Sequence, residues 1–280
     1  MTKPRRPFWS FLAAIIMLSH PLWSQRIITL APALTEIVYA LGGGDRIVGN
    51  TQFCDFPAAA RDKVKIGGLA DLNIELLVSL RPDLIIHYPE QSDRLVVLAR
   101  RCRLVEVRHS TLKEILVSIV VIAEAMGMKS RGEALSQSIS RELETKTLPT
   151  GKTDKKTVLV VVGRTGTDLK HMVVLGKQNF LDELLENAGG VNAYSGPIPY
   201  PLVSVESVIA LDPEVILEIS AHYEGINARE ISEFWNRFVM IEAVKLKKVF
   251  FVKDDFWLRP GPRLGLVAGQ LRHIIGHDQN

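Results

Sequence analysis

Short apolar runs and amphipathic segments alternate along most of this chain. The runs expected to form strands are residues 26–30, 46–49, 83–87, 103–108, 157–162, 214–219 and 248–253. The segments expected to form helices are residues 34–41, 74–80, 92–101, 180–188, 206–211 and 231–243. Strands that alternate with helices predict an α/β fold in which parallel sheets carry helices on both faces.

Two segments of the first half recur in the second half in the same order. Residues 34–43 align with residues 181–190, and both segments end in a Gly-Gly pair. Residues 73–86 align with residues 204–217, and in both copies a helix-capping residue precedes a glutamate by two positions. Chance similarity between two αβ units is the alternative. Two matched pairs in the same order favour two lobes of similar layout.

The region between the two halves has helical periodicity and no strand pattern. Apolar residues recur at helical spacing up to Met126, and Gly127 ends that stretch. A second helical stretch begins at the capping box Ser130–Glu133. We therefore expect an N-terminal lobe at residues 25–110, a stiff helical linker at residues 111–150 and a C-terminal lobe at residues 151–280.

The first 24 residues have the layout of a secretory signal peptide. Basic residues precede the apolar run Phe8–Leu18, and Pro21 and Ser24 follow it. The run is about half of the roughly 20 residues needed to span a bilayer. An uncleaved membrane anchor is the alternative, whereas no cysteine lies near the expected cleavage site to carry a lipid. We expect an exported, periplasmic protein.

Charge and cysteine content narrow the functional classes. The 34 basic and 31 acidic residues give a net charge of +3, and three of the basic residues lie in the first 24 positions. The remaining chain is neutral, which argues against a large nucleic-acid-binding surface. The two cysteines, Cys54 and Cys102, cannot form a tetrahedral cysteine zinc site. Export permits a disulfide between them, and two separate thiols are the alternative.

The loops that follow the expected strands hold many aromatic and charged side chains. These loops are residues 31–33, 51–57, 87–88, 163–166, 222–223 and 254–263, and the proline-rich loop 195–201 adds Tyr200. In open parallel sheets, ligands bind beyond the carboxyl ends of the strands. Aromatic walls with a few cations suit a large, flat, partly anionic ligand. Core packing is the alternative for any single aromatic residue.

Sequence motifs for catalysis are absent or incomplete. Gly42–Gly44 follows a helix and acts as a helix stop rather than a phosphate-binding loop, and no Gly-x-Ser-x-Gly elbow is present. His87, His109 and His222 lie at or after strand ends but lack the spacing of paired metal ligands. We expect no catalytic residue, no metal site and no resident cofactor, and we assign the histidines hydrogen-bonding roles.

Several of these segments together resemble the periplasmic solute-binding proteins of ABC importers for cobalamin and ferric siderophores. The matching segments are residues 26–36, 54–57, 73–86, 186–192, 203–206 and 259–263. The resemblance covers roughly residues 26–277 and implies two Rossmann-like lobes joined by a long rigid helix. It also implies a monomer that binds a small molecule and no nucleic acid, with an ABC permease and its ATPase as partners.

Within that family the chain is most similar to cobalamin-binding members. The ligand contacts that this similarity implies are Ala31, Pro32, Phe53, Tyr200, Phe256, Trp257 and Arg259. In the family, one glutamate per lobe docks into arginine pockets of the permease, and Glu75 and Glu206 stand at the matching positions. A role in complementing the helix dipole is the alternative for both acids.

The expected function is therefore the transport binding of a corrinoid in a cleft between two lobes, without catalysis. A ferric siderophore or haem is the alternative ligand. An exported enzyme or a cofactor chaperone on the same scaffold is the alternative functional class.

Overall fold

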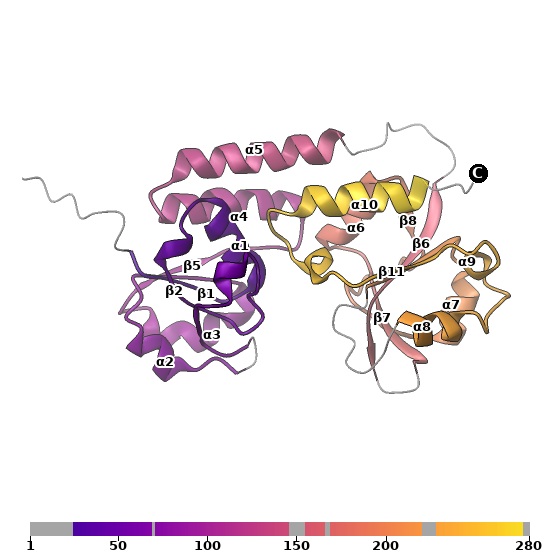
Figure 1. Ribbon diagram of the computed structural model, residues 1–280, viewed down its shortest axis with the longest axis horizontal. Helices are drawn as coiled ribbons and strands as arrows, with labels where there is room; N and C mark the ends of the chain where they lie inside the picture. Colours follow the sequence, from indigo (N-terminus) through magenta and orange to yellow (C-terminus); the bar gives the residue numbers. More distant parts are fainter. Residues whose placement is uncertain (1–24, 69–70, 146–154, 166–168, 220–227, 277–280) are drawn as a thin grey trace, which may run out of the picture.

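The computed structural model describes residues 25–68, 71–145, 155–165, 169–219 and 228–276. It forms two lobes side by side, bridged along one edge by helices (Figure 1). The expected signal peptide lies outside the described residues. Within the described residues, no helix is long and apolar enough to cross a membrane.

The N-terminal lobe is a five-stranded parallel sheet in the order β3-β2-β1-β4-β5. Its strands are β1 (Ile27–Thr29), β2 (Ile47–Asn50), β3 (Val64–Lys65), β4 (Leu84–His87) and β5 (Arg103–Glu106). Its helices are α1 (Pro32–Ala40), α2 (Ile74–Ser79) and α3 (Ser92–Leu95), with 3-10 turns at Gly44–Arg46, Ala58–Ala60, Pro89–Gln91 and Val96–Leu98.

Helices cover both faces of this sheet because neighbouring strand residues point to opposite sides. Ile27 and Ile86 pack on the side of α1, whereas Ile28 and Ile85 pack with Leu77 of α2 on the other side. The doubly wound α/β layout predicted for this lobe is confirmed.

The C-terminal lobe contains a mixed sheet rather than the parallel sheet that we predicted. Its strands are β6 (Lys156–Thr165), β7 (His171–Val174), β8 (Gly190–Asn192), β9 (Leu202–Ser204), β10 (Val215–Ile219) and β11 (Val249–Val252). The order is β11-β10-β6-β7-β9, and β8 pairs with β6. The β6–β7 and β7–β9 pairs are antiparallel. Too few residues separate β6 from β7 for the helical crossover that a parallel pair requires, so the chain turns back as a hairpin.

The helices of this lobe are α6 (Phe180–Asn187), α7 (Val205–Leu211), α8 (Ala228–Trp235), α9 (Glu242–Lys245) and α10 (Leu264–Gly276), with a 3-10 turn at Asp255–Leu258. The single helix expected at 231–243 is divided into α8 and α9. The carboxylate of Asp212 accepts a hydrogen bond from the backbone N–H of Glu242 at 2.8 Å, which caps a new helix start there.

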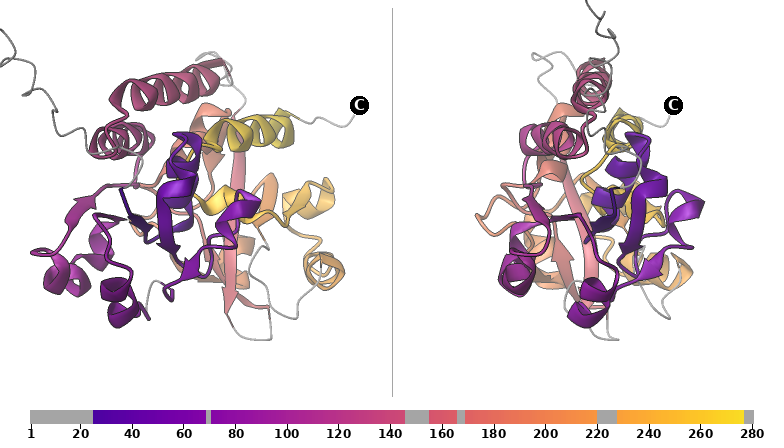
Figure 2. Two further views of the ribbon diagram at one scale, coloured as in Figure 1. Left: turned by 60° about the vertical axis from the view of Figure 1, so that its left-hand side comes forward. Right: turned by 90° about the vertical axis from the view of Figure 1, so that its left-hand side faces the viewer.

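The predicted linker consists of two antiparallel helices, and the first of them ends just before Gly127, where the sequence predicted a helix stop. α4 (Leu112–Ala125) and α5 (Lys129–Thr145) form a hairpin, and α5 runs from the N-terminal lobe toward the C-terminal lobe (Figure 1). Two further views show α5 stacked on the outer side of α4 (Figure 2). α10 packs against both α5 and α6. The lobes are therefore held together by a layer of three helices, α4, α5 and α10.

The two cysteines are free, which corrects the predicted Cys54–Cys102 bridge. Cys54 follows β2, and its buried sulfur lies 3.1 Å from the hydroxyl oxygens of Thr35 and Thr51. Cys102 precedes β5, and its thiol faces the carbonyl oxygen of Leu98 at 3.6 Å. In a parallel sheet, a residue that precedes one strand and a residue that follows another lie beyond opposite ends of the strands. The two sulfurs therefore cannot meet.

Candidate functional site

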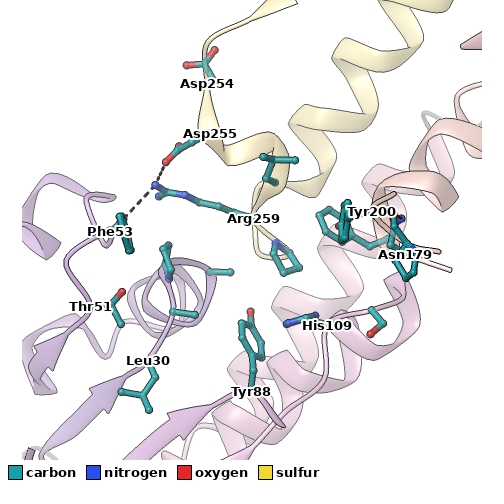
Figure 3. A pocket seen from close by; sticks show the side chains of 18 of the residues that line it. Leu30, Thr51, Phe53, Tyr88, His109, Asn179, Tyr200, Asp254, Asp255 and Arg259 are labelled. Atoms are coloured by element: carbon teal, nitrogen blue, oxygen red, sulfur yellow. Dashed lines mark hydrogen bonds and ion pairs between the residues drawn. The ribbon is translucent and has the colours of Figure 1, made fainter. Parts of the chain in front are cut away.

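A cavity of about 1150 Å³ lies between the two lobes (Figure 3). Residues of the N-terminal lobe that line it are Leu30, Ala31, Pro32, Ala33, Thr51, Gln52, Phe53, Asp55, Tyr88, His109 and Ser110. The second half of the chain contributes Gln178, Asn179, Phe180, Pro199, Tyr200, Lys253, Asp254, Asp255, Leu258, Arg259 and Pro260. All the N-terminal contributors follow the carboxyl ends of strands, as expected for an α/β sheet. The volume slightly exceeds the range of roughly 300–1,000 Å³ typical of small-molecule sites, which indicates a large ligand.

Aromatic rings form part of two facing walls of this cleft. Phe53 is 55% exposed and comes from the N-terminal lobe, whereas Tyr200 is 46% exposed and comes from the C-terminal lobe. The two side chains lie on opposite sides of the cavity (Figure 3). Large rings that remain this exposed can bury much additional surface when a flat ligand enters between them.

Partly buried polar contacts fix the loop that carries Phe53. The ammonium group of Lys65 on β3 donates to the side-chain oxygen of Asn50 at 2.9 Å and to the carbonyl oxygens of Cys54 at 2.8 Å and Ala60 at 3.0 Å. The side-chain amide of Asn50 also donates to the Ala60 carbonyl at 2.9 Å. These bonds replace the regular secondary structure that this loop lacks.

A close backbone approach fixes the opposite wall. The backbone N–H of Gly176 donates to the carbonyl oxygen of Pro199 at 2.8 Å. A side chain at Gly176 would overlap the carbonyl oxygen of Ile198, so only glycine permits this packing. The residue before Tyr200 is thereby held against the start of the α6 region.

Tyr88 and His109 form the floor of the cleft, and neither was predicted as a ligand contact. Their rings pack edge to face with centroids 3.9 Å apart (Figure 3). The backbone N–H of Tyr88 donates to the buried side chain of Gln91 at 3.0 Å, and Gln91 donates to the carbonyl of Leu30 at 2.8 Å. Burial raises the pKa of Tyr88, so its phenol keeps its proton. The sequence signal was their place after the strands β4 and β5.

Trp257 and Phe256 do not contact the cleft, contrary to the prediction. Trp257 is fully buried in the main core, and Phe256 packs its ring 4.8 Å from the guanidinium carbon of Arg263. Both residues lie in the 3-10 turn Asp255–Leu258, in which successive side chains point in different directions. Asp255 and Leu258 line the cleft from this turn instead.

Arg259 lines the cleft, but carboxylates already surround its guanidinium group. The group bonds Asp55 at 2.7 Å and Glu36 at 3.1 Å. It also bonds Asp255, and Figure 3 shows this contact. Burial acts to lower the pKa of Arg259, but the hydrogen bonds that Arg259 donates to Asp55 and Glu36 outweigh it and raise that pKa. Burial likewise acts to raise the pKa of Asp55, yet the bond and charge of Arg259 hold it below its ordinary value. The described cleft lining thus contains three carboxylates (Asp55, Asp254 and Asp255) and two cations (Lys253 and Arg259).

The described residues contain no group of three or more His, Cys, Asp or Glu side chains arranged to hold a metal ion. His87 is buried, and its Nδ1 lies 3.0 Å from the carbonyl oxygen of Tyr88. His222 lies outside the described residues.

Comparison with known proteins places this fold and cleft in a family. Residues 27–255 match the periplasmic binding protein family. The chain belongs to this family. A periplasmic binding protein with this two-lobed architecture is what the sequence resemblance predicted, and both the family and the fold class are confirmed.

Two relatives of this periplasmic binding protein show the extent of the similarity. A vitamin B12-binding protein of Vibrio cholerae is 27% identical over 252 residues, which cover 88% of this chain and 87% of that protein. The uncharacterized ABC transporter substrate-binding lipoprotein YvrC of Bacillus subtilis is 26% identical over 251 residues, which cover 86% of this chain and 76% of the relative.

Solved structures share the fold over nearly the whole length. The periplasmic heme-binding protein BhuT, in complex with two hemes, has a TM-score of 0.77 at 26% identity, covering 90% of this chain and 97% of that chain. The periplasmic vitamin B12 binding protein BtuF of Vibrio cholerae has a TM-score of 0.77 at 24% identity, covering 90% of this chain and 96% of that chain.

Glu75 and Glu206 occupy the same position in the two lobes of this periplasmic binding protein. Each is exposed and is the second residue of its helix, α2 or α7. The preceding caps also correspond: Asn73 accepts from the N–H of Leu76 at 2.9 Å, and Ser204 accepts from the N–H of Ser207 at 3.4 Å. A hydrogen bond with the side chain of Ser204 lowers the pKa of Glu206, so this acid is ionised at neutral pH. A docking role for the pair stays a prediction.

Proposed function

We propose that this chain is the extracytoplasmic substrate-binding component of an ABC importer and that it carries a corrinoid such as cobalamin in the cleft. The observation that carries the proposal is the cavity of about 1150 Å³ between Phe53 and Tyr200, which suits a macrocycle with two broad faces. The similarity to a vitamin B12-binding protein over 88% of the chain supports the same ligand class. Delivery to a permease and its ATPase follows from the importer role.

The charge of the cleft favours an amide-rich macrocycle over a strongly anionic one. The five charged side chains that line it in the described residues have a net charge of −1, and Arg259 is already paired with carboxylates. Haem carries two carboxylates that need unpaired cationic partners to leave water. The edge of a corrinoid is mostly neutral amide groups, which accept hydrogen bonds without that requirement.

Haem is the second candidate because of the floor of the cleft. The hydroxyl of Tyr88 has no hydrogen-bond partner within the described residues, and its ring contacts His109. Tyrosine and histidine are both ligands of haem iron in proteins. The raised pKa of Tyr88 opposes this candidate, because iron binds the phenolate rather than the phenol.

Binding without chemistry is the simplest activity for this site. The similar proteins with named ligands are binding proteins, which supports a non-enzymatic role. We infer that the protein acts as a monomer with no resident cofactor and no nucleic-acid partner.

Calorimetry of the purified protein with cobalamin, cobinamide, haem and a ferric siderophore tests the proposal. We expect one-to-one binding of the corrinoids. Phe53→Ala and Tyr200→Ala should each weaken that binding by about 1–3 kcal/mol, because each removes one wall. Leu202→Ala is the matched control, since Leu202 is 57% exposed but lies outside the cavity lining. Absence of heat with both corrinoids would reject the corrinoid assignment, and binding of haem alone would establish the second candidate.

A further inference from the structure

One buried carboxylate joins the two lobes beside the cleft. Glu36 lies on α1 of the N-terminal lobe and is 3% exposed. It accepts from Arg259 Nη1 at 3.1 Å, from Arg263 Nε at 2.8 Å and from Arg263 Nη2 at 2.6 Å. Both arginines lie between β11 and α10 of the C-terminal lobe. The two arms of the Arg263 fork therefore bind a carboxylate of the other lobe in the bidentate geometry that gives the strongest pairs.

Other contacts close the same joint. The guanidinium carbon of Arg263 lies 4.3 Å from the ring centroid of Phe56 in the N-terminal lobe and 4.8 Å from that of Phe256 in the C-terminal lobe. A side chain on Gly261 would begin 3.4 Å from the Cβ of Ala33, so the backbone of the arginine segment approaches the start of α1 closely. We call Glu36, Phe56, Phe256, Arg259 and Arg263 the interlobe cluster.

A second buried pair in the molecule has the same chemistry but lies within one lobe. Glu218 on β10 is fully buried and binds Arg164 of β6 through both of its oxygens, one of them at 2.8 Å. Arg164 also lies over two aromatic rings, Phe234 at 4.6 Å and Trp235 at 5.3 Å. This pair can stabilise the C-terminal lobe but cannot fix where the other lobe lies.

The interlobe cluster is continuous with both walls of the cleft. Ala31, Pro32 and Ala33 line the cavity at the start of α1, the helix that carries Glu36. Leu258, Arg259 and Pro260 line it from the segment that carries Arg263. Any separation of the lobes at this point must pull Glu36 from its arginines and widen the cavity.

We propose that Glu36 is a positioning residue that holds the cleft closed through Arg259 and Arg263, and that its pairing sets the rate at which ligand leaves. This inference rests on the proposed function of the cleft. Loss of the carboxylate charge makes the closed arrangement less favoured. The bound ligand then escapes more often, and the unliganded lobes move further apart.

The test compares Glu36→Gln with the matched control Glu218→Gln. Small-angle X-ray scattering of the ligand-free proteins needs no knowledge of the ligand, and stopped-flow release of cobalamin measures escape. We expect Glu36→Gln to increase the radius of gyration and to raise the cobalamin dissociation rate by about tenfold or more. Glu218→Gln should lower the melting temperature but leave both readouts within experimental error of the wild type.

A second variant keeps the inference testable if Glu36→Gln does not fold. Arg263→Gln removes the partner from the other lobe and should give the same two changes. If both single variants fold, their effects on the release rate should be less than multiplicative in the double variant, because both remove the Glu36–Arg263 pair. Unchanged scattering and unchanged release in a folded variant would overturn the proposal. Failure of the wild type to bind cobalamin would reject the proposed ligand, and the scattering comparison would still decide the role of Glu36.

Discussion

The two lobes are alike on their outer surface and unlike at the cleft. In both, a capped helix with a glutamate at its second position precedes a buried strand: α2 before β4, and α7 before β10. At the cleft, the N-terminal lobe presents Phe53 on a loop held by Lys65, whereas the C-terminal lobe presents Tyr200 on a loop held by Gly176. The two lobes are thus alike at these helix starts and different at the strand ends that line the cleft.

This difference matches the different symmetries of the partner and the ligand that the protein would contact. A partner with two equivalent halves meets both lobes in the same way, so equal acids at equal positions suit it. A ligand with two different faces needs two different walls. The three predictions that follow separate these two requirements, beginning with the largest expected effect.

Removal of the equivalent acids should strongly reduce transport and leave ligand affinity unchanged. In Glu75→Ala/Glu206→Ala, charge-assisted contacts with permease arginines would be lost at both ends, each worth about 1.5–3 kcal/mol. We expect permease-dependent uptake and ATPase stimulation to fall by at least about tenfold in reconstituted vesicles. Calorimetry should give the wild-type ligand affinity.

Asp93→Ala is the control for this pair. Asp93 is also an exposed acid in the first turn of a helix, α3, but it lies outside the two aligned segments 73–86 and 204–217. Full uptake by the double variant, or loss of ligand binding instead of uptake, would leave only the helix-dipole role for the two glutamates.

Loosening one wall of the cleft should weaken ligand binding without changing how the protein docks on the permease. Lys65→Met keeps most of the length of the side chain but leaves the carbonyls of Cys54 and Ala60 without their cationic donor. The loop that carries Phe53 then becomes mobile, and we expect corrinoid affinity to fall by about tenfold, with a lower melting temperature. Lys63→Met, just before β3, is the control. Wild-type affinity in Lys65→Met would show that Phe53 does not depend on this support.

The sequence predicted the central strands well because a fully buried strand forms a recognisable apolar run. Runs such as Leu84–His87 and Val215–Ile219 are entirely buried, so nearly every position is apolar. The mixed sheet was missed because β7 and β9 are short and partly polar, and pairing direction depends on the turn between strands rather than on the strand itself. The helix α10 was missed because its glycines and its histidine obscured the helical period.

The cleft was predicted less well, and the reason is local geometry. Phe53 and Tyr200 lie in loops, and the family resemblance implied them as ligand contacts; both line the cavity. Trp257 looked equivalent in sequence, yet a single turn of 3-10 helix rotates it into the core. The role of Glu36 depends on contacts across 223 and 227 residues, which no local pattern contains.

The smallest expected effect is a pH dependence of the melting temperature that arises from the N-terminal side of the cleft. His109 lies on the N-terminal side of the cleft, and none of the described lining residues from the C-terminal lobe is a histidine. Burial lowers the pKa of His109 below its ordinary value of 6.5, although Glu90, 4.0 Å from Nε2, acts to raise it. Between the lowered pKa and the ordinary one, the unfolded chain binds a proton that the folded chain does not. Folding stability is therefore fully present above the ordinary pKa and declines as the pH falls through the lowered one.

We expect the melting temperature of the wild type to fall more than that of His109→Gln from about pH 8 to about pH 5. A constant difference between the two proteins over that range would show that His109 does not titrate in the way that its burial implies.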